Sequence, residues 1–136
     1  MPFVLDASIT ACWAFDDEDH PLAAHALERL REDGAVAPSL WWFEVRNMLI
    51  VNERRGRITE GDTAAFLRGL SRLGVAVDRS PDEGAVLTLA RRHRLTAYDA
   101  SYLELSLRES LPLATLDREL ERAARAEGCV VLGDGH

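Results

Sequence analysis

The sequence predicts an α/β protein, a three-layer α/β/α sandwich with a central parallel sheet. Short apolar runs typical of buried strands alternate with longer segments whose apolar residues recur at helical spacing. Strands separated by helices need crossover connections, which give parallel sheets covered by helices on both faces. The 136 residues are 47% hydrophobic and 29% charged, so we expect one folded domain spanning residues 1–136.

Each expected element is bounded by capping or turn residues. Asp6 stops the first apolar run, Pro21 suits the first turn of a helix, and Gly34, Gly56 and Gly74 suit helix ends. We expect strands at residues 3–5, 35–37, 75–77, 113–115 and 129–132. We expect helices at about residues 7–15, 21–34, 39–55, 59–74, 80–93, 100–109 and 117–127, with a charged loop at 16–19.

Composition excludes several classes of function. The formal net charge is −7, which argues against a protein that coats nucleic acid through a large basic surface. The sequence contains no lysine and no histidine motif for zinc. No apolar run is long enough to cross a bilayer, and the N-terminal residues do not form a signal peptide, so we expect a cytoplasmic protein without a membrane partner.

Two carboxylates directly follow expected strands. Asp6 ends the first strand and Asp117 comes two residues after the fourth, so both belong to the carboxyl edge of the sheet, where such folds bind ligands. Ser8 and Thr115 each lie two residues from one of these acids. The alternative is that both acids only cap the helices that follow them.

Of two further acids, one occurs within a helical segment and one directly before another. Glu44 lies on one helical face with Trp41 and Met48, and a carboxylate on an apolar face needs a ligand or a partner. The alternative for Glu44 is an ion pair with an arginine. Asp99 directly precedes another apolar helix, where it could also be a cap.

Four sequence blocks, in order, resemble the PIN-domain nucleases and, among these, the VapC-type toxins of bacterial toxin–antitoxin pairs. The resemblance covers nearly the whole chain. The blocks are Val4-Leu5-Asp6-Ala7-Ser8, residues 38–45 (PSLWWFEV), residues 95–105 (LTAYDASYLEL) and residues 113–120 (LATLDREL).

The resemblance implies a divalent-metal-dependent endoribonuclease that leaves 5′-phosphate and 3′-hydroxyl ends. The catalytic and metal-binding acids are then Asp6, Glu44, Asp99 and Asp117, which hold Mg²⁺ or Mn²⁺. The hydroxyls of Ser8 and Thr115 support the carboxylates or a metal-bound water. Arg46 and Arg118 are the best candidates for contacting RNA, because they adjoin the site acids in sequence.

The resemblance also implies partners. We expect a VapB-like antitoxin and a homodimer. The apolar surfaces near four aromatic residues are candidates for antitoxin docking, although most of these residues are expected to fill the core: Trp13, Trp41, Trp42 and Phe43.

Other proteins with acids at strand ends fit the sequence less well. Phosphotransfer receiver domains and haloacid-dehalogenase-like phosphatases both need a lysine, and the sequence contains none. The main alternative is a PIN-like module that binds RNA or protein without cleaving it. All four site acids are present, which favours the enzyme.

Overall fold

The computed structural model describes residues 1–15 and 20–133, so the charged loop expected at 16–19 lies outside the described residues. The strands are β1 (Phe3–Leu5), β2 (Ala35–Pro38), β3 (Ala76–Asp78) and β4 (Leu113–Ala114). The helices are α1 (Ala7–Ala14), α2 (Pro21–Asp33), α3 (Ser39–Arg54), α4 (Glu60–Leu73), α5 (Glu83–His93), α6 (Ala97–Glu109) and α7 (Arg118–Ala126).

The four strands form one parallel sheet in the order β3-β2-β1-β4. The chain passes from β1 to β2 and β3 on one side, and β4 returns to the other side of β1. The strand order therefore reverses beside β1, and ligands bind at the carboxyl ends of strands at such a reversal. Asp6 directly follows β1 at this position.

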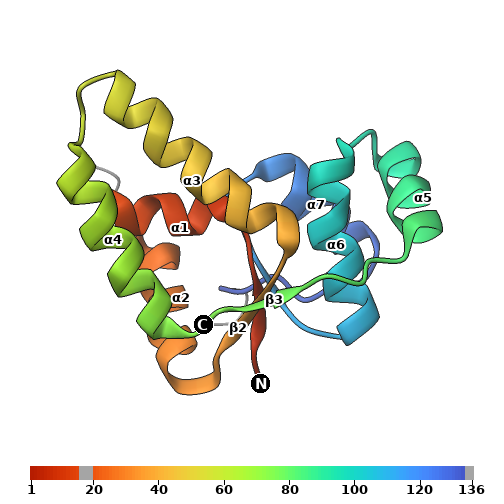
Figure 1. Ribbon diagram of the computed structural model, residues 1–136. Coiled ribbons are helices and arrows are strands. Elements are labelled where there is room, and N and C mark those ends of the chain that lie inside the picture. Colours follow the sequence, from red (N-terminus) through yellow and green to blue (C-terminus); the bar gives the residue numbers. More distant parts are fainter. Residues whose placement is uncertain (16–19, 134–136) are drawn as a thin grey trace.

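Helices cover both faces of the sheet, which confirms the predicted fold class. Helices α1–α4 lie on one side and α5 and α6 on the other, with α7 packed against α6 (Figure 1). The side chains of β1, Phe3-Val4-Leu5, are completely buried between the two layers. In residues 1–15 and 20–133, no helix combines the length and apolar character needed to span a membrane.

The expected elements differ most from the structure in three places. Helix α5 begins at Glu83 instead of residue 80, because the Asp82 side chain accepts a hydrogen bond from the Ala85 backbone N–H and caps the helix there. Helix α6 begins at Ala97 instead of Ala100, because the Thr96 hydroxyl accepts a hydrogen bond from the Asp99 backbone N–H and caps the helix there. The strand expected at 129–132 is wrong as a full strand. Only Val131 pairs with Leu113, because the chain turns at Leu132 and Gly133.

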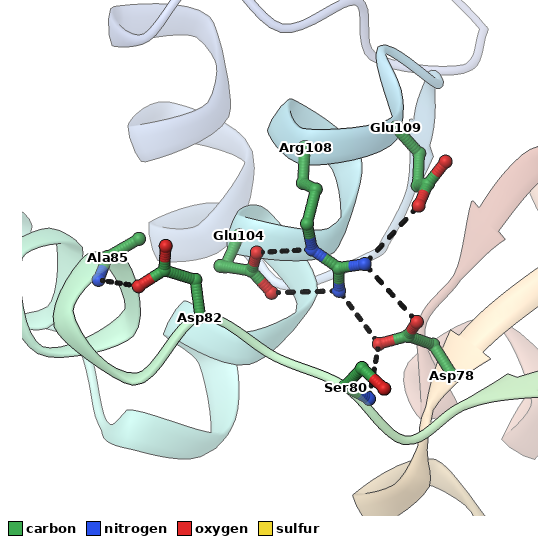
Figure 2. A network of polar contacts seen from close by, with 7 residues as sticks. All are labelled: Asp78, Ser80, Asp82, Ala85, Glu104, Arg108 and Glu109. Carbon is green, nitrogen blue, oxygen red and sulfur yellow. Dashed lines mark hydrogen bonds and ion pairs between the residues drawn. The ribbon is translucent and has the colours of Figure 1, made fainter.

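An ion cluster joins α6 to the end of β3 (Figure 2). The Arg108 guanidinium donates hydrogen bonds to Glu104 at 2.7 Å and to Asp78 at 2.7 Å, and it also contacts Glu109 at 3.3 Å. Glu104 is only 3% exposed, so a buried charge needs this partner. We call these four residues the Arg108 cluster. It fixes α6 against the sheet.

Candidate active site

The Asp6 carboxylate accepts hydrogen bonds from two hydroxyl groups, one in the segment after β1 and one in the segment after β4. The Ser8 hydroxyl donates to its Oδ2 at 2.7 Å and the Thr115 hydroxyl donates to the same oxygen at 2.6 Å. Each hydroxyl also accepts a backbone N–H, Ser8 from Leu116 and Thr115 from Asp117. These bonds lock Asp6, Ser8 and the segment after β4 into one arrangement.

The alternative that Asp6 is only a helix cap is wrong, since its side chain makes no capping bond to α1. Asp6 is 6% exposed. Burial raises the pKa of Asp6 above its usual value, the hydrogen bonds from Thr115 and Ser8 lower it, and the charge of Asp117 raises it. A carboxylate at this position is therefore costly to keep ionised.

Glu44 reaches the same region from α3. The Tyr102 hydroxyl, on α6, donates to Glu44 Oε1 at 2.6 Å. Burial raises the pKa of Glu44, the Tyr102 hydrogen bond opposes this, and the charges of Asp6 and Asp99 add to the increase. Burial and the nearby charges of Asp6 and Glu44 likewise raise the pKa of Tyr102. The predicted alternative, an ion pair between Glu44 and an arginine, is wrong within the described residues.

Asp99 lies in the first turn of α6 and is half-buried. The capping side chain of α6 is Thr96, so the alternative that Asp99 is the cap is wrong. Burial, followed by the charges of Asp117 and Asp6, raises the pKa of Asp99 to about 6. Asp99 therefore interacts electrostatically with two other members of the predicted site.

Asp117 does cap a helix. Its Oδ1 accepts the backbone N–H groups of Glu119 and Leu120 at 2.9 and 3.1 Å, at the start of α7. The capping alternative is therefore correct for this residue. Its charge still raises the pKa of Asp6 and Asp99, so capping does not remove Asp117 from the site.

The four predicted acids thus form one electrostatic group, which we call the acidic cluster: Asp6, Glu44, Asp99 and Asp117. Within residues 1–15 and 20–133, no arginine or histidine forms an ion pair with any of them. Like charges brought together without a cation disfavour ionisation. The arrangement is suited to a positively charged ligand.

The donor set of the acidic cluster fits a hard divalent cation. Carboxylate oxygens are the ligands that Mg²⁺ prefers, and a cation would stabilise the charges that burial and mutual repulsion now disfavour. In the described part of the chain, no three His, Cys, Asp or Glu side chains are grouped as ligands of one ion. Mg²⁺ commonly takes one or two carboxylates and keeps several waters, so it does not require such a cage.

In the part of the chain that the structure describes, neither predicted RNA-contacting arginine forms a hydrogen bond or ion pair with the acidic cluster. Arg46 stacks on the Trp42 ring at 3.9 Å and donates to the Trp42 carbonyl at 3.1 Å. Arg118 is the exposed first residue of α7, next to Asp117. Both side chains lie on elements that carry a member of the acidic cluster.

The aromatic residues considered for partner docking divide into two groups. Trp41 is 4% exposed, and its indole N–H donates to Thr10, so it belongs to the core. Trp13 is half-buried and donates to the Ala23 carbonyl. Trp42 and Phe43 are exposed at 45% and 67%.

Sequence reasoning missed Tyr102. In the sequence it lies in a helical segment beside Leu103 and close to Leu105. Its spacing of three residues from Asp99 puts both side chains on one helical face, and this was the available signal. The contact with Glu44 spans 58 residues and could be found only in the folded chain.

The protein belongs to the class of α/β proteins that combine a parallel sheet with a group of acids at the carboxyl edge of that sheet. The PIN domain family model matches residues 3–126. Ribonuclease VapC3 of Pyrobaculum aerophilum is 32% identical over 124 residues, which cover 88% of this chain and 92% of that protein. The chain belongs to the PIN domain family, as the sequence blocks predict.

Two solved structures are similar in fold. The crystal structure of PAE2754 from Pyrobaculum aerophilum superposes with a TM-score of 0.75 at 26% identity, covering 96% of this chain and 83% of that one. FitAcB from Neisseria gonorrhoeae gives a TM-score of 0.58 at 15% identity, covering 95% of each chain, and supports the fold alone.

Proposed function

We propose that this chain is a divalent-metal-dependent endoribonuclease of the VapC type. Its membership of the PIN domain family and its similarity to a ribonuclease VapC3 support an RNA-cleaving activity. The acidic cluster is the observation that carries the proposal. Four carboxylates share one region, without an arginine or histidine ion pair in the described residues, at the edge of the sheet where ligands bind.

Mg²⁺, or Mn²⁺ in its place, would be held by oxygens of the acidic cluster. When bound, such an ion supplies polarisation of the phosphodiester, activation of water and stabilisation of developing negative charge. The orientation of the Asp6 carboxylate is fixed, because two hydroxyls donate to one of its oxygens. In this proposal Ser8 and Thr115 orient that carboxylate.

Three other features of the chain serve the same reaction. The pKa of Asp99 is raised to about 6, so near neutral pH this carboxyl is mostly ionised, and a bound cation would favour its ionised form further, releasing any remaining proton to solvent. Asp117 stays oriented because it caps α7. The N-terminal end of α6, which carries Asp99, presents a positive dipole end toward negative charge.

Arg46 and Arg118 are proposed to contact the RNA backbone. Arg46 lies on α3, which carries Glu44, and Arg118 begins α7, which Asp117 caps. Arg118 is exposed, while Arg46 is half-buried against Trp42. A chain with a net charge of −7 needs such local positive charge to bind a polyanion.

The proposed biological role is that of the toxin in a VapBC-type pair, acting in the cytoplasm and restrained by a VapB-like antitoxin. Similarity to ribonuclease VapC3 supports this role. Exposed Trp42 and Phe43 offer apolar surface for protein contact. A homodimer is part of the same proposal.

The test is RNA cleavage by the purified protein. We expect total bacterial RNA to be cut with Mg²⁺ or Mn²⁺ and left intact with EDTA. Asp6→Asn and Asp99→Asn should each slow cleavage by about 100-fold or more, because each removes charge from the acidic cluster. Asp78→Asn is the matched control, since Asp78 belongs to the Arg108 cluster, and should still cleave.

Full activity in either site variant would contradict the proposed site. Thermal unfolding of each variant confirms that it is folded. RNA binding without cleavage by the wild-type protein would favour the silent PIN-like module over the enzyme.

A further inference from the structure

Tyr102 connects the two helices that carry Glu44 and Asp99. We propose that Tyr102 is a positioning residue of the active site, whose hydroxyl holds the Glu44 carboxylate in the orientation that binds the divalent cation. This inference rests on the proposed function, because it concerns the same acidic cluster. It adds a residue that lies outside the four acids and the two supporting hydroxyls.

The geometry of Tyr102 supports this role. Its ring is completely buried, and the hydroxyl donates to Glu44 Oε1 at 2.6 Å. The ring cannot move without disturbing the core, so the donor is fixed in space. Glu44 is a flexible side chain on α3, and a fixed donor removes much of its rotational freedom.

A neutral donor suits a cation site better than an arginine would. Glu104, elsewhere on α6, is held by the guanidinium of Arg108, which cancels its charge. The tyrosine hydroxyl orients Glu44 and leaves its negative charge available to a metal ion. Outer residues that orient metal ligands contribute to metal affinity in this way.

The position of Tyr102 also couples two members of the acidic cluster. It lies three residues after Asp99 on α6, on the same helical face. The Glu44 carboxylate is therefore held relative to the helix that carries Asp99. One buried ring thus sets the relative position of two acids that are distant in sequence.

The experiment measures Mn²⁺ binding by isothermal titration, without RNA. Tyr102→Phe keeps the ring and removes only the hydroxyl, and we expect Mn²⁺ affinity to fall about 10- to 100-fold. Tyr98→Phe is the matched control, because Tyr98 lies on the same helix and is 66% exposed. It should bind Mn²⁺ like the wild type. Thermal unfolding checks that both variants are folded at the temperature of titration.

The same substitution in a Glu44→Gln background tests whether Tyr102 acts through Glu44. We expect Tyr102→Phe to have no further effect on Mn²⁺ affinity there. Unchanged affinity in the single variant would overturn the inference, and so would an equal loss in both backgrounds. Either result would leave the proposed function standing, whereas a wild-type protein that binds no Mn²⁺ would overturn the metal site and the inference together.

Discussion

The chain contains two groups of neighbouring acids, and in the described residues only one of the groups is paired with an arginine. In the Arg108 cluster one guanidinium contacts all three carboxylates (Figure 2). In the acidic cluster the identified donors to Asp6 and Glu44 are neutral hydroxyls. In the described residues the fold therefore pairs one group of acids with an arginine and leaves the other without a cationic partner.

The pKa values follow this difference. The hydrogen bond from Arg108 lowers the pKa of Asp78, whereas burial first, and neighbouring acids in addition, raise the pKa of Asp6, Glu44 and Asp99. The Arg108 cluster stabilises the folded chain. The acidic cluster costs stability in the absence of a cation, which is typical of a site retained for binding or catalysis.

The largest effect on stability is expected from breaking the Arg108 cluster. Arg108→Met leaves buried Glu104 without its cation, so the free energy of unfolding should fall by about 2–3 kcal/mol. Urea unfolding at pH 7 measures this change. RNA cleavage at a temperature where the variant is folded should persist, because Arg108 contacts no member of the acidic cluster in the described structure.

Glu109→Gln is the control for that experiment. Glu109 is 50% exposed, so its contact with Arg108 should contribute less than about 1 kcal/mol. Equal losses in the two variants would show that burial of Glu104 is not the cause.

A smaller effect is expected from pH. The pKa of Asp99 is about 6 in the folded chain and near 3.8 ordinarily, so the folded state binds more protons between these values. The metal-free protein should therefore become more stable as the pH falls from 7 to 5. Thermal unfolding in EDTA measures the shift, and Asp99→Asn should reduce it.

Adding Mn²⁺ tests the role of Asp99 in the presence of a cation. At pH 7 the ion should raise the unfolding temperature of the wild type more than that of Asp99→Asn, because it binds the ionised carboxylates of the folded state. If the unfolding temperatures of the wild type and of Asp99→Asn changed equally with pH in EDTA, the pH effect would not belong to Asp99.

The smallest effect is expected at Arg118. If this arginine contacts RNA phosphate and not the acidic cluster, Arg118→Ala should reduce the slope of log K against log salt by about 1. RNA binding over a salt series measures that slope. Mn²⁺ affinity serves as the control and should stay unchanged. A loss of Mn²⁺ affinity would instead place Arg118 within the metal site.

Much of the fold could be predicted because its signals are local. The capping box of Thr59 and Asp62 and the left-handed Gly74 mark the two ends of α4 where the sequence indicates them. The strand expected at 129–132 was wrong because pairing depends on the path of the chain after Val131. Helix α6 begins earlier than the sequence predicts because Thr96, and not a residue nearer Ala100, caps its first turn.

The candidate site could likewise be predicted only in part. Positions after strands and on apolar helical faces identified the four acids, but the sequence could not separate capping from other roles. Asp117 proved to be a cap, and Asp6 and Asp99 did not. For Glu44 the sequence left open a ligand role or an ion pair with an arginine. No such ion pair forms in the described residues, and the Tyr102 hydroxyl donates a hydrogen bond to Glu44 instead.

The sequence alone determined the types of the elements and the family. It also indicated which acids follow strands or lie at helix starts near one edge of the sheet, because periodicity and capping act within a few residues. Only the tertiary structure decided which acids are neutralised. Thr115 lies 109 residues from Asp6 and Tyr102 lies 58 residues from Glu44. Contacts over such separations arise from how the helices pack on the sheet, and no local pattern encodes them.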